Sequence, residues 1–331
     1  TDALDLLKHT SIGGNGTVYG HLDTEEHVKN LVNPTMISLR KNGSLLGMGV
    51  FCNLQVMVNQ NPFNCFYVRY FSASPEIRGK GLMKKFGKQA MGLIREGQKQ
   101  KTIFYASVEK NNISSVKVIN EAGYKAIRKI KTIGFSRYFP KNSPNIRKVQ
   151  DPMEKKTIMD MLKSFYSDYS LVQFTKIFHL GDYYYIEENG KIVAGCQIHR
   201  VHWVIKRMEG LKGKMMVRII PFLPLLRNIF NPRKFKFLAL EGVFFKEGKE
   251  AKLFELIEGL LAQNKVNAAL IWLDEHCNIY RQLTKFGNLG LLNNFTRKTD
   301  TLLMASFVGM TDDEVAQTIS NPVYISSFDF T

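Results

Sequence analysis

A glycine-rich, basic segment stands at the start of a predicted helix. It reads Ser74-Pro75-Glu76-Ile77-Arg78-Gly79-Lys80-Gly81-Leu82-Met83. Residues 65–73, just before it, are rich in Phe, Tyr and Val and predict a strand, and residues 82–98 have the apolar spacing of a helix. The first turn of a helix offers unpaired backbone N–H groups and the positive end of the helix dipole, and glycine lets a phosphate approach the backbone. The segment therefore predicts an anion-binding loop.

The spacing of the glycines excludes two familiar nucleotide-binding loops. The Gly-x-x-x-x-Gly-Lys-Ser/Thr pattern of the P-loop is absent, and so is the three-glycine dinucleotide fingerprint. Basic residues nevertheless dominate this region, because residues 78–101 contain eight Lys or Arg and one acid, Glu96. Such a run is either a solvated face or a surface that attracts a phosphorylated cofactor, nucleic acid or an anionic membrane.

The elements that position the loop recur later in the chain. Two Asn-Gly pairs, at 42–43 and 189–190, lie between apolar runs and predict hairpins with type I′ turns. The order strand, loop, helix, strand and helix is predicted over 65–122 and again over 237–285. The glycines at corresponding positions, Gly81 with Gly248 and Gly123 with Gly287, are 167 and 164 residues apart. Offsets this similar favour a duplicated architecture.

The length of the chain and a break in its composition predict two domains. A chain of 331 residues is longer than one hydrophobic core usually supports, and Pro, Asn and Ser cluster at 138–145. We expect a first domain at 1–140, which holds the loop, and a second at 144–331. The second carries an insertion at 212–236 with seven basic residues and no acid. The apolar part of this insertion is either buried packing or a surface for a membrane or a lipid-like acceptor.

The order of elements and two motifs resemble the Gcn5-related N-acetyltransferase (GNAT) superfamily. Its loop signature is Arg/Gln-x-x-Gly-x-Gly/Ala, which Arg78 and Gly81 match and from which Met83 departs. Its second motif is Asn-x-x-Ala, then Tyr, then Gly-Phe. The residues at those spacings are Asn112, Ser115, Ile119, Gly123 and Tyr124. The chain is similar to a tandem-domain member with a degenerate C-terminal copy, which implies an α/β fold of the α+β type with two GNAT-like mixed β-sheets flanked by helices.

The resemblance also implies a cofactor, acetyl-CoA (CoA), in the first domain. The pantetheine arm is expected along the end of the strand, and backbone amides of the loop are expected to hold the pyrophosphate. The residues expected to bind the cofactor are Phe71, Ser72, Ala73, Arg78, Gly79, Lys80, Gly81, Leu82, Met83, Asn112, Ser115 and Ile119. The corresponding loop around Gly248 contains two acids, Glu247 and Glu250, which oppose phosphate binding. We therefore expect no CoA in the second domain.

The reaction implied by the resemblance is N-acetyl transfer, in which an amine attacks the thioester directly. A general base must then take a proton from the ammonium form of the acceptor. The candidates are Glu109, which otherwise is an ordinary loop carboxylate, and Tyr105, which otherwise is a core aromatic. Ile119 stands where many family members carry a Tyr that protonates the leaving thiolate, so that acid is missing or supplied elsewhere.

The net charge of +17 bears on the partners. It repels polycationic protein tails, so we expect a small-molecule or amphipathic amine as acceptor. Nucleic acid is not the partner we expect. Peripheral membrane contact and the oligomeric state are left open. Two alternatives also stay open: an aminoacyltransferase of the Fem type, or a non-catalytic CoA-binding or nucleic-acid-binding module. The loop at 78–81 speaks against the Fem type, because those enzymes have no CoA pyrophosphate to hold.

The cysteines and histidines predict no metal site. Cys52, Cys65, Cys196 and Cys277 lie far apart without a Cys-x-x-Cys pair, which indicates neither a disulfide framework nor a zinc site and is typical of a reducing cytoplasm. His199 and His202 are three residues apart in or after a strand and so face different sides. The longest uncharged stretch, 42–68, contains five Asn and two Gln, so it cannot cross a bilayer.

Overall fold

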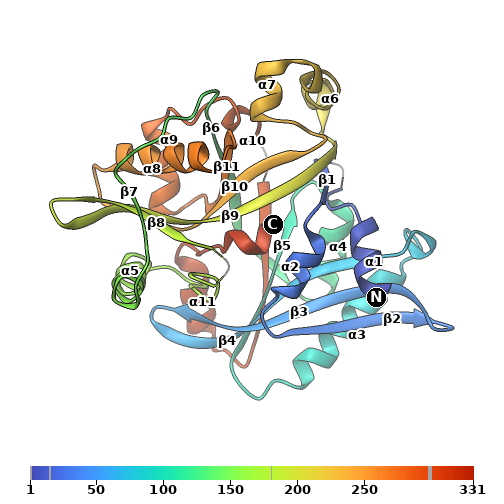
Figure 1. Ribbon diagram of the computed structural model, residues 1–331. Helices are drawn as coiled ribbons and strands as arrows, with labels where there is room; N and C mark the ends of the chain where they lie inside the picture. Colours follow the sequence, from blue (N-terminus) through green and yellow to red (C-terminus); the bar gives the residue numbers. More distant parts are fainter. Residues whose placement is uncertain (1, 15, 180, 297–299) are drawn as a thin grey trace.

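The computed structural model describes residues 2–14, 16–179, 181–296 and 300–331, and its strands join in one mixed sheet (Figure 1). The strands are β1 Val18–His21, β2 Pro34–Lys41, β3 Ser44–Val58, β4 Asn61–Ala73, β5 Thr102–Glu109, β6 Lys125–Ser136, β7 Ile146–Lys148, β8 Tyr183–Glu188, β9 Lys191–Arg207, β10 Phe235–Phe245, β11 Ala268–Asp274 and β12 Asp300–Val308. The α-helices are α1 Asp2–His9, α2 Thr24–Lys29, α3 Leu82–Glu96, α4 Ile113–Glu121, α5 Pro152–Phe165, α6 Gly210–Ile219, α7 Pro224–Ile229, α8 Glu250–Gln263, α9 Asn278–Phe286, α10 Asn293–Thr296 and α11 Asp312–Ser320. Short 3-10 helices are η1 Pro75–Ile77, η2 Ile220–Phe222 and η3 Ser327–Phe330. The predicted α/β class is confirmed.

The strands of both halves form a single sheet where two had been expected. Its order is β2-β3-β4-β5-β12-β6-β11-β10-β9-β8-β7, and β1 pairs with β9. The two halves merge because β12 lies between β5 and β6, while β6 also pairs with β11. The last strand of each half therefore covers an edge of the other half, which would otherwise expose unpaired N–H and C=O groups. The domain boundaries at 140 and 144 stay a prediction.

Each half contains one parallel pair of strands that part after a short ladder. The pairs are β4 with β5, over 64–67 and 102–105, and β10 with β11, over 238–239 and 269–270. Just beyond the paired residues, the longer strand of each pair has a residue of positive φ, Tyr70 at +53° and Gly242 at +56°. The register against the neighbouring antiparallel strand shifts at both places. The same irregularity in both halves agrees with a duplicated architecture.

Two cores lie on opposite faces of the first half of the sheet, as the alternation of side chains along a strand requires. Along β4, Phe66 packs in a core to which α3 contributes Phe86. The neighbouring Cys65 and Tyr67 face another core, to which α1 contributes Leu7. Figure 1 accordingly shows α3 below the strands and α1 and α2 above them. A further core packs α5, α8 and α9 against the strands of the second half.

The backbone angles confirm both predicted Asn-Gly turns. Both Asn-Gly turns have positive φ at both residues, 49° and 81° at 42–43 and 50° and 71° at 189–190, as a type I′ turn requires. Asn112 caps α4, because its side-chain oxygen accepts the Ser115 N–H at 3.2 Å. The four cysteines are free and buried. None of the described helices is both long and apolar enough to cross a bilayer.

Candidate cofactor and catalytic site

The predicted anion loop joins β4 to α3 with two glycines in the left-handed region. Gly79 has φ of +76° and Gly81, at the N-terminal cap of α3, has φ of +73°. A Cβ atom at either position would have no neighbour within 4 Å. Glycine is therefore required here by the backbone conformation and not by crowding. The space above the loop is open to a ligand.

Several backbone N–H groups of this loop have no acceptor within the described part of the chain. They belong to Gly79, Gly81, Leu82 and Met83, whereas the Lys84 N–H bonds back to the Gly81 carbonyl at 3.1 Å. No side chain caps the start of α3. Unpaired N–H groups at a helix start are the donors that bind phosphate oxygens.

Met83, which departs from the family signature, points away from this space. Its side chain packs in the core beneath α3, and its sulfur would lie 2.7 Å from a Cβ placed on Gly47 of β3. Because Gly47 has no side chain, it leaves the space that the Met83 side chain fills. Only the Met83 amide faces the loop, so the departure removes no phosphate donor.

Some basic side chains near the loop already form an ion pair or a hydrogen bond within the protein, and others do not. Lys84 forms an ion pair with Glu121 of α4 at 2.6 Å, and the Arg78 Nε donates to the Ala73 carbonyl at 3.1 Å. Lys80, Lys85 and Lys88 are exposed, and none of them has an ion-pair partner among the described residues. The exposed lysines can therefore neutralise a phosphorylated ligand, while Arg78 fixes the shape of the loop.

The strand that leads into the loop has a free edge. β5 pairs with β4 only as far as Tyr67, so residues 68–73, which include Phe71, Ser72 and Ala73, have no ladder with β5. The Phe71 ring lies over α3, with its centroid 5.4 Å from that of Phe86. An extended arm could pair with this edge, as the resemblance implies for pantetheine.

The corresponding edge in the second half is filled by its own side chains. The Tyr183 hydroxyl donates to the Gly242 carbonyl at 2.8 Å, and the Tyr166 hydroxyl donates to the Val243 carbonyl at 2.6 Å. Both tyrosines are buried. The edge of β10 beyond its bulge is thus occupied, in contrast with the edge of β4.

The helix of the second motif lies beside α3. Ile119 is half-buried against the same core as Phe86, and it has no group that could protonate a thiolate. Asn112, at the other end of α4, lies against the glycine-rich stretch near the N-terminus, because a Cβ on Gly14 would approach it to 2.9 Å. The Asn112 oxygen is engaged as the cap of α4.

Glu109, a predicted base, closes over the same glycine-rich stretch. Its carboxylate accepts the Thr17 N–H at 3.1 Å, and a Cβ on Gly16 would collide with it. Burial raises the pKa of Glu109, and hydrogen bonds from the Thr17 and Gly14 amides oppose that rise. The carboxylate therefore holds Gly14 and Thr17 in place at the end of β5.

Tyr105, the other predicted base, contacts an acid that the sequence reasoning missed. Its ring stacks on Tyr67 at 4.8 Å, at the last residue pair before β4 and β5 part. The Tyr105 hydroxyl donates to the Asp329 carboxylate at 3.1 Å, and the Tyr67 hydroxyl donates to the Asp329 main-chain carbonyl at 2.8 Å. Burial raises the pKa of Tyr105 well above its ordinary value, so its phenol stays protonated.

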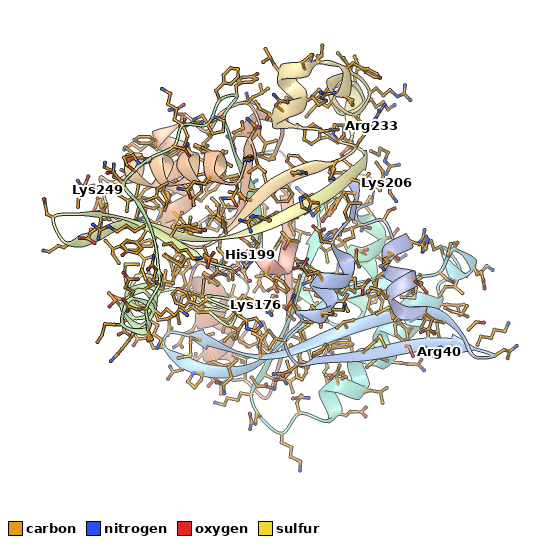
Figure 2. All side chains as sticks on the ribbon, viewed as in Figure 1. Arg40, Lys176, His199, Lys206, Arg233 and Lys249 are labelled. Atoms are coloured by element: carbon orange, nitrogen blue, oxygen red, sulfur yellow. The ribbon has the colours of Figure 1, made fainter. Side chains whose placement is uncertain are left out.

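Asp329 lies in η3, in the interior between the two halves. Burial raises the pKa of Asp329 to about 7, Arg69 opposes this rise and Glu241 adds to it. The segment is anchored to the second half as well, because Ser326 donates to Glu241 at 2.7 Å. Lys176 lies over the Phe328 ring at 4.6 Å, and Figure 2 places it in the same interior region as His199. A separation of 224 residues from Tyr105 left no local pattern that could have revealed Asp329.

Arg69 is a second residue that sequence reasoning missed. It directly precedes the bulge at Tyr70 and is buried, with 9% of its surface exposed. One Nη2 bond reaches the Thr331 main-chain oxygen at 3.0 Å, but its Nε and Nη1 have no partner among the described residues. Buried N–H groups without an acceptor are costly unless an oxygen of a ligand or water meets them. Arg69 is therefore a candidate contact for a substrate oxygen.

Residues 13–124 match the model of the Acetyltransferase (GNAT) family. That span contains every residue expected to bind the cofactor and both expected bases, whereas Asp329 lies outside it. No curated protein sequence matches the chain.

Solved structures share the fold over most of the chain. N-myristoyltransferase from Saccharomyces cerevisiae with bound myristoyl-CoA has a TM-score of 0.59 at 9% identity, over 94% of this chain and 82% of that one. A protein from Enterococcus faecalis V583, described as a probable N-acyltransferase, has a TM-score of 0.51 at 12% identity, over 93% of this chain and 70% of that one. At such identities the likeness is one of fold.

Proposed function

We propose that this protein, whose residues 13–124 belong to the GNAT acetyltransferase family, transfers an acyl group from acyl-CoA to an amine. The observation that carries the proposal is the loop at 79–83, where four unpaired N–H groups meet the free edge of β4. The loop would hold the pyrophosphate and the edge would hold the pantetheine arm. Acetyl-CoA is the donor to test first.

We place the cofactor in the first half only. The free edge of β4 has its counterpart in β10, but Tyr166 and Tyr183 occupy the carbonyls there. The loop before α8 also has acids at Glu247 and Glu250, where the first half has Lys80 and Met83. Both differences disfavour a second cofactor of the same kind.

The reaction forms one N–C bond and breaks one C–S bond. The amine attacks the thioester carbonyl, CoA leaves as a thiolate, and the nitrogen releases a proton. We propose that Asp329 takes that proton, because its pKa of about 7 suits a base near neutral pH and it lies where β4 and β5 part. Tyr105 positions this carboxylate, and the free N–H groups of Arg69 donate to a substrate oxygen. A thiol pKa of about 8.5 lets the thiolate leave without a dedicated acid.

Glu109 is the alternative base. Its carboxylate is already engaged by the Thr17 N–H, so it would have to exchange this contact for the acceptor. Replacement by Gln separates the two assignments: Glu109→Gln would weaken the contact with the Thr17 N–H and raise the KM, whereas loss of the true base lowers kcat at neutral pH.

Calorimetric titration with CoA and with acetyl-CoA tests the cofactor site. We expect one site in the wild type and, in Gly81→Glu, binding weakened by at least about tenfold, because a carboxylate would face the phosphates. Gly248→Glu is a matched control, since Gly248 also has a positive φ of +76° and open space around its Cβ position. Loss of binding in Gly248→Glu but not in Gly81→Glu would show that the site has been placed in the wrong half.

An activity assay distinguishes an enzyme from a protein that only binds CoA. Release of CoA from acetyl-CoA is followed with a thiol reagent in the presence of a panel of amines, both polar and amphipathic. Transfer to at least one amine supports the enzyme, and Asp329→Asn should slow it by about a hundredfold or more without changing the Kd for CoA. Tight CoA binding without turnover on any amine would favour a non-catalytic CoA-binding protein.

A further inference from the structure

The insertion between β9 and β10 forms a helical hairpin that stands away from the sheet. It comprises α6, η2 and α7, residues 210–229, and Figure 1 shows α6 and α7 projecting beyond the ends of the two strands. Met216, Ile220 and Ile229 are buried and fix the hairpin to the protein. The alternative that the whole insertion is buried packing is therefore wrong, because only one side of it is used for packing.

The opposite side of the hairpin exposes large apolar side chains. Their exposed fractions are 76% for Leu211, 50% for Met215, 44% for Ile219, 71% for Phe222, 41% for Leu223 and 57% for Leu225. The first three are spaced by four residues in α6, so they form one stripe along the helix. Burial of these side chains in a folded monomer would be favourable, so a contiguous exposed group of this kind marks an interaction surface.

Basic side chains border this apolar surface, and residues 212–236 of the sequence contain no acid. Lys214, Arg218, Arg227, Arg233, Lys234 and Lys236 are all exposed. None of these six has an ion-pair partner within the described part of the chain. The Arg233 guanidinium lies 5.6 Å from the centre of the Phe222 ring, so one cation is held directly beside an exposed apolar side chain. Figure 2 shows Arg233 and Lys206 at the base of the hairpin.

We propose that this hairpin docks the protein on an anionic lipid surface. Exposed Leu, Met, Ile and Phe on one side of a short helix, bordered by Lys and Arg, are suited to the boundary between acyl chains and charged headgroups. Nucleic acid would use the cations but would leave the aliphatic stripe in water. A second copy of this chain would bring the same basic residues face to face, and the chain already carries a net charge of +17.

The hairpin is connected to the first half near the candidate site. Glu209, which precedes α6, accepts a hydrogen bond from Asn111 at 3.0 Å, and Asn111 immediately precedes the cap of α4. Lys206 donates to Ser11 at 2.8 Å, beside the stretch that covers Glu109. Docking by the hairpin would therefore hold the first half close to the lipid surface. The lipid contact itself does not depend on acyl transfer.

Sedimentation with vesicles tests the docking. The probes are vesicles of phosphatidylcholine and vesicles of phosphatidylcholine mixed with phosphatidylglycerol. We expect the wild type to sediment with the mixed vesicles and not with the neutral ones, and to be released by salt. Arg218→Glu with Arg227→Glu should weaken binding by at least about tenfold, since each basic side chain near an anionic surface contributes a factor of about five. Leu211→Ser with Leu225→Ser should weaken it similarly.

Matched controls lie elsewhere on the surface. Lys156→Glu with Lys163→Glu makes the same change of charge on α5, and Phe139→Ser with Met153→Ser removes two side chains that are 77% and 73% exposed. Both controls should sediment like the wild type, and all variants should keep the melting temperature of the wild type. Equal loss of binding in the controls would show a general effect of charge and would overturn the proposal.

A fluorophore reports whether the hairpin enters the lipid. Because the four native cysteines are buried, F222C offers a single accessible thiol for an environment-sensitive dye. We expect a blue shift of its emission on mixed vesicles, and no shift of the same dye on M153C. Failure of the wild type to bind anionic vesicles, or binding to RNA in place of vesicles, would refute lipid docking and would leave the CoA titration unaffected.

Discussion

Asp329 is the residue on which the proposed chemistry depends most. A carboxylate with a pKa near 7 is half ionised at neutral pH, so it can both take and return a proton. Its partners explain that value: burial among aromatic residues disfavours the charge, while Arg69 offsets part of the penalty. Tyr105 adds one hydrogen bond to the carboxylate and keeps it oriented.

Replacement of Asp329 by Asn should change activity in a pH-dependent way. We expect kcat of the wild type to rise with pH up to about 7 and then to level, because the base must be ionised. In Asp329→Asn, kcat should fall by about a hundredfold or more at pH 8 and lose this rise. Asp160→Asn, an exposed acid on α5, is the control and should keep the profile. A wild-type profile in Asp329→Asn would assign the base elsewhere, to Glu109 first.

The same variant should also change the pH dependence of stability. The pKa of Asp329 is raised in the folded state, so the folded protein binds a proton more tightly than the unfolded chain. The resulting stability is fully present below about pH 4 and is lost as the pH rises to about 7. Asp329→Asn should therefore be more stable than the wild type at pH 8, with the difference vanishing near pH 4. Chemical unfolding at both pH values measures it.

At the scale of elements, β3 and α3 pack together through a large residue on α3, Met83, that lies opposite a glycine on β3, Gly47. The family signature has a small residue where this chain has Met83, and the chain has Gly47 opposite it. The larger side chain fills the core beneath α3 and leaves the amide of residue 83 facing the loop. The larger side chain at position 83 is thus accommodated in the core by Gly47, and the backbone of the loop is not changed to make room for it.

A double-mutant cycle tests this fit. Gly47→Ala places a Cβ 2.7 Å from the Met83 sulfur, so it should destabilise the protein by about 1–3 kcal/mol. In a Met83→Ala background the same change should cost less than about 1 kcal/mol, since the obstructing side chain is gone. The Kd for CoA should stay the same in Met83→Ala.

Gly92→Ala serves as the control for this cycle. Gly92 lies within α3, and a Cβ there would meet nothing within 4 Å. Alanine should be tolerated or slightly stabilising at that position, because glycine is a poor helix former. Equal costs of Gly47→Ala in both backgrounds would show that Met83 is not what constrains Gly47.

At the scale of the whole molecule, the two halves depend on each other through exchanged strands. β12 separates β5 from β6, and η3 places Asp329 against β4 and β5. The proposed base therefore comes from the second half and the cofactor loop from the first. The family match ends at residue 124, so it includes neither β6 nor β12.

Expression of residues 1–140 alone should give no folded protein. Without β11 and β12, one edge of β5 and both edges of β6 lose their partners, and Ile103 and Ile130 lose the second-half residues of their core. We expect aggregation and no cooperative melting, and recovery of a soluble complex when 144–331 is co-expressed. Cooperative melting of 1–140 by itself would show that the first half is an independent domain.

The sequence by itself determined the local parts of this protein. The Asn-Gly turns and the glycine loop before α3 were predictable, because each depends on residues within a few positions of one another. The two short motifs also indicated the GNAT family, which the match over 13–124 bears out.

Tertiary structure alone decided which distant residues meet. Asp329 and Tyr105 are 224 residues apart, and their contact depends on how β12 and η3 enter the first half. The apolar residues of 210–229 could equally have been core or surface by sequence, because hydrophobicity shows that a side chain can be buried but not whether a partner is present to bury it. Long-range packing settles both questions: it brings Asp329 against Tyr67 and Tyr105 at the point where β4 and β5 part, and it leaves one side of the hairpin exposed.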